Sequence, residues 1–95
     1  MDKQYYVYIL TNKWGTTLYT GITNNLARRV EEHKMQTVDG FAKRYNLAKL
    51  AYYAICETAD AAISEEKRIK GGSRKDKVEL IQTMNPTWRD LSDDL

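Results

Sequence analysis

Four side chains could take part in chemistry, because packing alone does not explain where the sequence places them. Glu66 falls on the apolar stripe that Ala62 and Ile69 would form along a helix. A carboxylate on such a face costs free energy unless it is paired or binds a cation. Arg29 and His33 lie four residues apart, so on a helix they would project side by side. This pair suits a shared anion, although an ordinary surface pair, and a salt bridge for Glu66, remain open alternatives.

Tyr8 is the fourth of these residues, and Tyr19 is a similar case. Tyrosines in apolar segments most often belong to the core, but a buried phenol needs a hydrogen-bond partner and so directs its oxygen toward a polar site. A phenol, an arginine, a histidine and a lone carboxylate are together the groups that hydrolyse a phosphodiester with one divalent ion. The carboxylate would bind Mg²⁺, the arginine would neutralise charge on the phosphate oxygens, and a phenol or imidazole would accept the proton of the attacking water.

The apolar pattern predicts the elements that must position these residues. The aromatic and β-branched run 5–10 and the segment 17–22 read as two strands, and the short loop between them makes an antiparallel hairpin. Gly21, inside the second strand, marks a bulge or a place where another group approaches the backbone closely. Residues that cap or end helices indicate where the helices begin and stop, and they predict helices over 26–35, 58–70 and 73–84. A third apolar strand is predicted over 50–57.

This order of elements predicts an α+β fold, in which helices flank a three-stranded, mainly antiparallel sheet in the order β-β-α-β-α-α. Residues 37–47 have a mixed pattern and are assigned to no element. A single domain is expected over residues 1–95. Trp88 and Leu91 are expected to fold back over the core. The inward faces of the last two helices are expected to consist of Ala59, Ala62, Ile63, Glu66 and Ile69, and of Val78, Ile81 and Met84.

The composition excludes several classes of protein. Hydrophobic residues make up 42% and charged residues 29%, which is typical of a globular chain and not of a disordered one. The single cysteine, Cys56, excludes an internal disulfide, and with the single histidine it also excludes a Cys/His structural zinc site. The first residues lack the pattern of a signal peptide, and no apolar run is long enough to cross a membrane. We therefore expect a soluble cytoplasmic protein with no membrane association.

Charge is unevenly distributed, although the formal net charge is only +2. Residues 67–77 contain six basic side chains and one acidic one, whereas residues 89–95 contain one arginine and three aspartates. A basic segment of this kind is either a solvated helix face or a surface that contacts phosphates.

The residues singled out above also stand in an order that resembles a known family, the GIY-YIG nuclease superfamily. Tyr6-Val7-Tyr8 is similar to its first signature, with Tyr6 in place of the glycine, and Tyr19-Thr20-Gly21 is similar to its second, with Thr20 in the middle. The resemblance covers residues 4–91 and is strongest to the small stand-alone bacterial branch, which is similar to the N-terminal catalytic domain of the excision-repair endonuclease. The family's arginine, histidine, metal-binding glutamate and late asparagine correspond to Arg29, His33, Glu66 and Asn85.

The resemblance implies a Mg²⁺-dependent (or Mn²⁺-dependent) DNA endonuclease, structure-selective or weakly specific, that serves DNA repair or recombination. Tyr8 would activate water with help from His33 and Tyr19. Arg29 and a metal ion on Glu66 would stabilise the transition state, and the late asparagine would order the site by hydrogen bonds.

The alternative is a non-catalytic DNA-binding module with the same fold, acting with a partner protein that supplies DNA specificity. In either case the basic segment is expected to contact the phosphates of DNA without reading its bases. The residues expected to make these contacts are Arg44, Lys67, Lys70, Arg74, Lys75 and Lys77.

Overall fold

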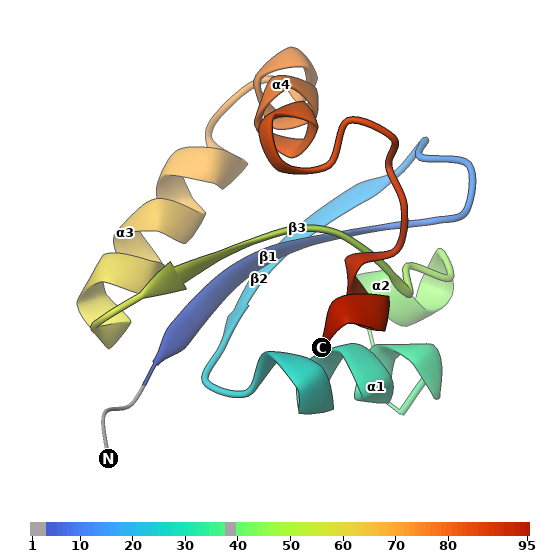
Figure 1. Ribbon diagram of the computed structural model, residues 1–95, viewed down its shortest axis with the longest axis horizontal. Helices are drawn as coiled ribbons and strands as arrows, with labels where there is room; N and C mark the ends of the chain where they lie inside the picture. The colour runs from blue at the N-terminus through green and yellow to red at the C-terminus, as the bar shows by residue number, and fades with distance from the viewer. Residues whose placement is uncertain (1–3, 38–39) are drawn as a thin grey trace.

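An antiparallel sheet of three strands lies at the centre of the computed structural model, which describes residues 4–37 and 40–95 (Figure 1). The strands are β1 (Tyr5–Thr11), β2 (Leu18–Thr23) and β3 (Lys49–Cys56), in the order β2-β1-β3. The continuous apolar run of β1 explains its central place, because a middle strand is covered on both faces. The sheet predicted from the sequence is confirmed, and each strand boundary differs from the prediction by no more than one residue.

The three predicted helices are also confirmed, as α1 (Leu26–Lys34), α3 (Ala59–Lys70) and α4 (Arg74–Met84). Each begins after a side chain that accepts a hydrogen bond from a free backbone N–H of the first turn. The capping residues are Asn25, Thr58 and Ser73, and Ser73 forms a reciprocal capping box with Asp76.

Two short elements were not predicted. A single helical turn, α2 (Phe41–Arg44), lies in the segment 37–47, and a 3₁₀ turn, η1 (Leu91–Asp94), follows the last helix. One turn is too short to show a helical period in the sequence, so neither element left a signal. No helix in the described part of the chain is both long and apolar enough to cross a membrane.

The sheet separates two layers of helices, with α3 and α4 on one face and α1, α2 and η1 on the other (Figure 1). Successive side chains of a strand point to opposite faces, so β1 contributes to both layers. Tyr8 and Leu10 pack in the core on the α1 side, whereas Val7 and Ile9 pack in the core on the α3 side. Leu91 folds back into the first core and Trp88 packs against the second, as expected.

The predicted inward face of the last two helices is wrong in part. Ile63 is 39% exposed and Met84 is 40% exposed, and Ala59 is exposed as well. The buried residues of α3 are Ala62 and Ile69, which are seven residues apart, so the buried stripe of this helix is narrow. Ala59 and Ile63 lie beside that stripe. Met84 is the last residue of α4.

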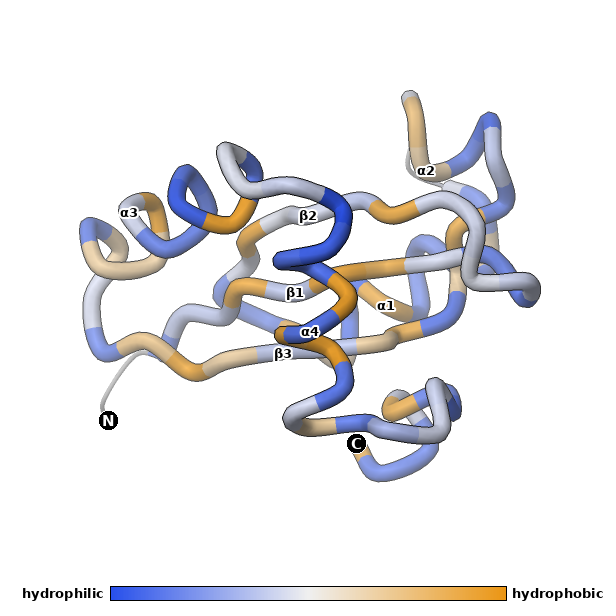
Figure 2. The backbone as a smooth tube through the Cα atoms, turned by 90° about the horizontal axis from the view of Figure 1, so that it is seen from above, coloured by the Kyte–Doolittle hydropathy of each residue, from blue (hydrophilic) through white to orange (hydrophobic). Residues whose placement is uncertain are grey.

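Two helices lie on the side of the sheet formed by β2. Seen from above, α3 and α2 both lie on the β2 side of the sheet, whereas η1 lies on the β3 side (Figure 2). Side chains from α1, α2 and α3 can therefore converge on β2, and most of the predicted catalytic residues come from these elements and the two strands of the hairpin.

Candidate active site at the β2 edge

Tyr8 lies across the backbone of its neighbour strand. It pairs with Gly21 in the register of β1 and β2, and its side chain is 2% exposed. A Cβ atom built at Gly21 would lie 2.6 Å from the Tyr8 hydroxyl oxygen and 2.7 Å from its Cζ atom, closer than real contacts allow. The close approach to Gly21 predicted from the sequence is confirmed. The bulge offered as the other reading is not at Gly21, since the register irregularity lies at Ile9 and Leu10, between β1 and β3.

We expect Gly21→Ala to displace the Tyr8 phenol and to lower the rate of phosphodiester cleavage about 100-fold, the effect of a misplacement of ~1 Å. The secondary structure should survive, because the residue lies in an edge strand. Cleavage rates and far-ultraviolet circular dichroism measure the two effects. A Gly21→Ala protein that cleaves at the wild-type rate would show that the position of the phenol is unimportant.

The rings of His33 and Tyr19 lie next to Tyr8. His33, from α1, is 5% exposed and its Nε2 atom lies 3.5 Å from the Tyr8 hydroxyl oxygen. The Tyr19 ring, from β2, lies 6.5 Å from the Tyr8 ring and 6.2 Å from the His33 ring, measured between centroids. The structure therefore brings together both predicted tyrosines and the predicted histidine, with the phenol and the imidazole at hydrogen-bond reach.

The pKa values of Tyr8 and His33 shift in opposite directions relative to their usual values. Burial raises the pKa of the Tyr8 phenol, and the neighbouring Tyr19 and the charge of Glu66 raise it further, while the Arg29 guanidinium acts against them. Burial lowers the pKa of His33, and Arg29 lowers it further, with a smaller opposing effect from Glu32. Near neutral pH the phenol therefore keeps its proton and the imidazole is neutral, so one His33 nitrogen is available to accept a proton.

Arg29 lies close enough to act on both groups, and its side chain is incompletely paired. Its Nε atom lies 3.6 Å from the Glu32 Oε1 atom, beyond hydrogen-bond distance. Both atoms are buried and have no hydrogen-bond partner among the residues that the structure describes. A buried donor that lacks a partner is rare in a folded protein and is typical of a place where a ligand binds.

Glu66 lies on α3, which is on the opposite face of the sheet from α1 and near the β2 edge (Figures 1 and 2). Its side chain is 20% exposed and pairs with Lys70 at 3.6 Å, so the salt bridge left open by the sequence does exist. The Lys70 side chain is 52% exposed and the contact is long, so a cation could replace the lysine at the carboxylate. The charge of Glu66 also raises the pKa of Tyr8, which places the carboxylate within electrostatic reach of the phenol.

These residues fit a hydrated divalent ion. Within residues 4–37 and 40–95, no three His, Cys, Asp or Glu side chains form a group that could hold a metal. A metal ion at Glu66 would thus have one protein carboxylate and would complete its shell with water and phosphate oxygens, which is the usual situation for Mg²⁺ beside a phosphate.

Asn85 has a different position from the other predicted catalytic residues. It is 2% exposed at the end of α4, and its Nδ2 atom donates to the carbonyl oxygens of Ala51 (3.1 Å) and Arg89 (2.7 Å). Its Oδ1 atom accepts from the backbone N–H of Arg89 at 3.1 Å. Because these bonds use its carboxamide on both sides, Asn85 holds the C-terminal segment against β3 and contacts neither Tyr8 nor His33 by any hydrogen bond that the described residues form.

We expect Asn85→Ala to lower the free energy of unfolding by about 2–3 kcal/mol, because it leaves buried backbone groups without partners. Urea denaturation measures this loss. The control is Asn24→Ala, at an exposed position, which should change stability by no more than about 0.5 kcal/mol. An unchanged urea midpoint for Asn85→Ala would refute this structural role.

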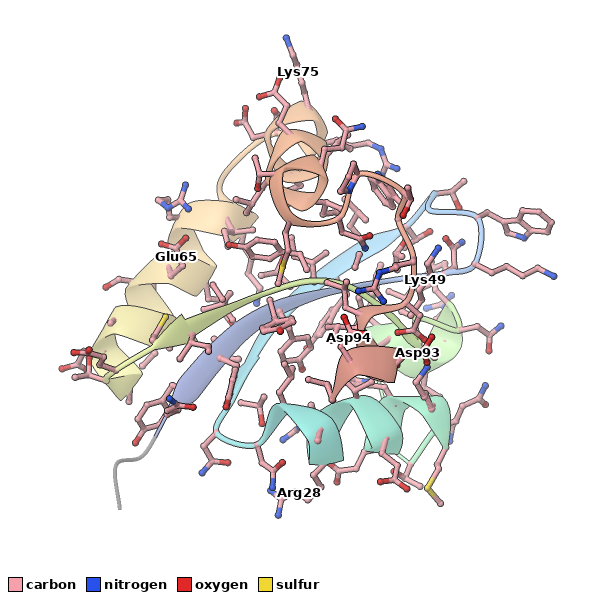
Figure 3. All side chains as sticks on the ribbon, viewed as in Figure 1. Arg28, Lys49, Glu65, Lys75, Asp93 and Asp94 are labelled. Carbon is pink, nitrogen blue, oxygen red and sulfur yellow. The ribbon has the colours of Figure 1, made fainter. Side chains whose placement is uncertain are left out.

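The predicted nucleic-acid-binding residues divide into two groups. Arg74 donates to the carbonyl oxygens of Gly15 and Thr16 in the β1–β2 loop, and Lys77 donates to that of Gly72. These two cations, like Lys70 beside Glu66, make contacts within the fold. Lys67 and Lys75 are exposed, and the Lys75 side chain extends away from the top of α4 (Figure 3). The last of the set, Arg44, lies on α2, with its guanidinium 5.7 Å from the centre of the Tyr45 ring.

Sequence reasoning missed three residues next to the site. Phe41, from α2, stacks on Tyr19 with ring centroids 6.3 Å apart, and Tyr45 packs on Phe41. Glu32 lies beside Arg29 and influences both Tyr8 and His33. The spacing of Phe41 and Tyr45, four residues apart with two basic residues between them, was the available signal.

Comparison with known proteins identifies the class to which the chain belongs. The pattern of the GIY-YIG catalytic domain matches residues 4–80. The chain therefore belongs to the GIY-YIG family, whose catalytic domains are nucleases that generally use a divalent metal ion.

Relatives that are similar to this chain over most of its length include several UPF0213 proteins. The chain is 35% identical to a UPF0213 protein of Oceanobacillus iheyensis, over 86% of its own length and 94% of that protein. It is 37% identical to a UPF0213 protein of Clostridium perfringens, over 82% and 83% of the two chains. The solution NMR structure of a UPF0213 protein of Bacillus halodurans is similar, with a TM-score of 0.58 and 25% identity over 92% of each chain. The predicted resemblance to the small stand-alone branch is confirmed.

Proposed function

We propose that this chain is a Mg²⁺-dependent DNA endonuclease that hydrolyses phosphodiester bonds. One observation carries the proposal: the buried Tyr8 phenol lies 3.5 Å from the Nε2 atom of His33, which is neutral near pH 7. The family match supports the same reaction class.

The pKa directions support a relay of protons. A phenol with a raised pKa is a poor base while it keeps its own proton, so Tyr8 must give that proton away as it takes one from water. His33 Nε2 accepts the Tyr8 proton, and Tyr8 accepts the proton of the attacking water. The hydroxide formed attacks phosphorus in line while the bond from phosphorus to the leaving oxygen breaks, and the leaving oxygen takes a proton from solvent water. Tyr19 packs against both rings and holds them in place.

Arg29 and a metal ion at Glu66 would stabilise the negative charge of the phosphate. The guanidinium of Arg29, whose side chain is 35% exposed, would donate to a phosphate oxygen and stabilise the charge that grows there in the transition state. A Mg²⁺ ion held at Glu66 supplies Lewis-acid stabilisation of the same phosphate when it is bound. Mn²⁺ has the same preference for oxygen ligands and should substitute for it.

The exposed lysines on α3 and α4 would attract the DNA backbone without reading its sequence. The site holds one phosphate and reads no base edge through any residue described above, which supports weak sequence specificity. Selection of damaged or branched DNA during repair or recombination would then come from the shape of the DNA or from a partner protein.

The rate of cleavage should depend on pH through His33. Because its pKa is lowered below 6.5, the rate should be constant above about pH 6.5 and should fall as the pH drops through the lowered pKa. The folded state also binds fewer protons there than the unfolded state, so stability should be full above that pH and should decrease in the same direction below it. Rate–pH profiles and thermal melts between pH 4 and 9 measure both effects, and His33→Gln should remove this dependence of stability.

A cleavage panel tests the function as a whole. Duplex, flap, single-stranded and branched DNA would be incubated with the full chain in Mg²⁺, in Mn²⁺ and in EDTA. Cleavage in either metal and none in EDTA is the expected result. Binding to DNA with no cleavage of any substrate in either metal would refute the proposal and would support the non-catalytic module.

A further inference from the structure

A row of three aromatic rings leads from the candidate active site to the surface. The Tyr19 ring stacks on Phe41 at 6.3 Å with an angle of 22° between their planes, and Phe41 packs on Tyr45 at 4.6 Å. Phe41 is 47% exposed and Tyr45 is 44% exposed. We call Tyr19, Phe41 and Tyr45 the aromatic row.

The outer two rings are not explained by the packing of the fold. Neither Phe41 nor Tyr45 is part of the two core clusters that the described residues form, whereas Tyr19 packs against the core on the α1 side. Large rings that remain half in water gain little from burial, and exposed aromatic residues beside a site are typical of a surface that binds a partner. Tyr19 belongs to the ring cluster around Tyr8, so the row is continuous with the site.

The charge beside the row indicates the chemistry of that partner. Lys43 and Arg44 lie between Phe41 and Tyr45 on α2, and the Arg44 guanidinium lies 5.7 Å from the centre of the Tyr45 ring. Cationic side chains interleaved with exposed rings are the arrangement that binds single-stranded nucleic acid, where the cations contact phosphates and the rings stack on bases. An apolar protein partner would not need the two cations.

We infer that the aromatic row is a stacking platform for unpaired bases of DNA next to the phosphate that the site cleaves. This inference rests on the proposed function and adds the substrate class. A base pair inside a duplex has both of its faces covered by its neighbours, so only an unpaired or extruded base can stack on Phe41 and Tyr45. The preferred substrate is therefore single-stranded DNA, or a branched DNA with a single-stranded segment at the site.

Binding measured in EDTA tests the platform without any cleavage. The full chain would be titrated into a fluorescein-labelled single strand and into a duplex of the same sequence at one salt concentration. Wild type should bind the single strand more tightly. Phe41→Ala and Tyr45→Ala should each weaken single-strand binding by about 5- to 100-fold, the range of base–aromatic stacking, and should leave duplex binding within about twofold.

Matched variants separate stacking from other effects. Tyr45→Phe keeps the ring and should bind as wild type does, whereas Phe41→Leu keeps an apolar side chain without a ring and should behave as Phe41→Ala. Trp14→Ala removes a more exposed ring, 75% exposed in the β1–β2 loop, and should change neither affinity. Circular dichroism confirms that each variant is folded.

The outcomes distinguish this inference from the proposed function. Equal loss of single-strand and duplex binding, or no loss at all, overturns the platform even if the wild-type chain cleaves DNA. A selective loss of single-strand binding supports the platform even if no cleavage is found. A single strand that binds no more tightly than the duplex also overturns it.

Discussion

Glu66→Gln is expected to lower the rate of Mg²⁺-dependent cleavage by about 10³-fold, because it removes the carboxylate charge proposed to hold the metal ion next to the phosphate. Glutamine keeps the size of the side chain and one carbonyl oxygen but loses the negative charge. The fold should be retained, since the ion pair of Glu66 with the half-exposed Lys70 is long. Single-turnover cleavage at saturating enzyme measures the loss of the chemical step.

Glu65 is the matched control for this experiment, because it is the neighbouring carboxylate on α3 and is ion-paired with Arg68 on the same helix (Figure 3). Its pKa is lowered by the hydrogen bonds from Arg68, so its charge is already neutralised within the helix surface. Glu65→Gln should cleave within about twofold of wild type. Equal rates for the two variants would show that no metal acts through Glu66.

Arg29→Ala is expected to reduce cleavage by about 10³-fold, the lower end of the effect of an arginine that stabilises a phosphoryl transition state. We also expect this variant to change the pH dependence of the rate, which a loss of stability alone would not do. Because Arg29 lowers the pKa of His33, its removal should move the acidic limb of the rate–pH profile to higher pH. The residual activity of the variant, followed between pH 5 and 8, measures this shift.

Arg28 is the matched control for Arg29. It precedes Arg29 on α1 but is exposed, and its side chain points away from the sheet (Figure 3). Arg28→Ala should leave both the rate and its pH profile within about twofold of wild type. If Arg28→Ala and Arg29→Ala lost activity equally, the role of α1 would be general attraction of DNA and not catalysis.

The secondary structure could be predicted because its signals are local. The caps at Asn25, Thr58 and Ser73 act on backbone groups within three residues, so they are readable from sequence alone. The apolar runs of the strands are local in the same way. The one-turn helix α2 contains too few residues for a period, and for that reason the segment that carries Phe41 and Tyr45 was assigned to no element.

Burial of helix faces could be predicted only in part. The period places Ile63 and Met84 on the same side as Ala62 and Ile81, but a helix that touches a sheet along a narrow line buries fewer residues than its apolar stripe contains. The width of the contact between helix and sheet depends on the position of the helix relative to the sheet. The same reason applies to the basic residues, because the distance from Arg74 to the β1–β2 loop depends on how α4 packs.

For this protein, residue types, spacing and capping by themselves determined the three strands and the three main helices, and they singled out the candidate reactive groups. Only the tertiary structure decided that Tyr8 lies across Gly21, that His33 is neutral beside it, and that Asn85 supports the chain instead of touching the phenol. It also decided that Phe41 and Tyr45 extend the site. Protonation states and contacts of this kind depend on burial and on distances between residues far apart in the sequence, which exist only once the elements have packed.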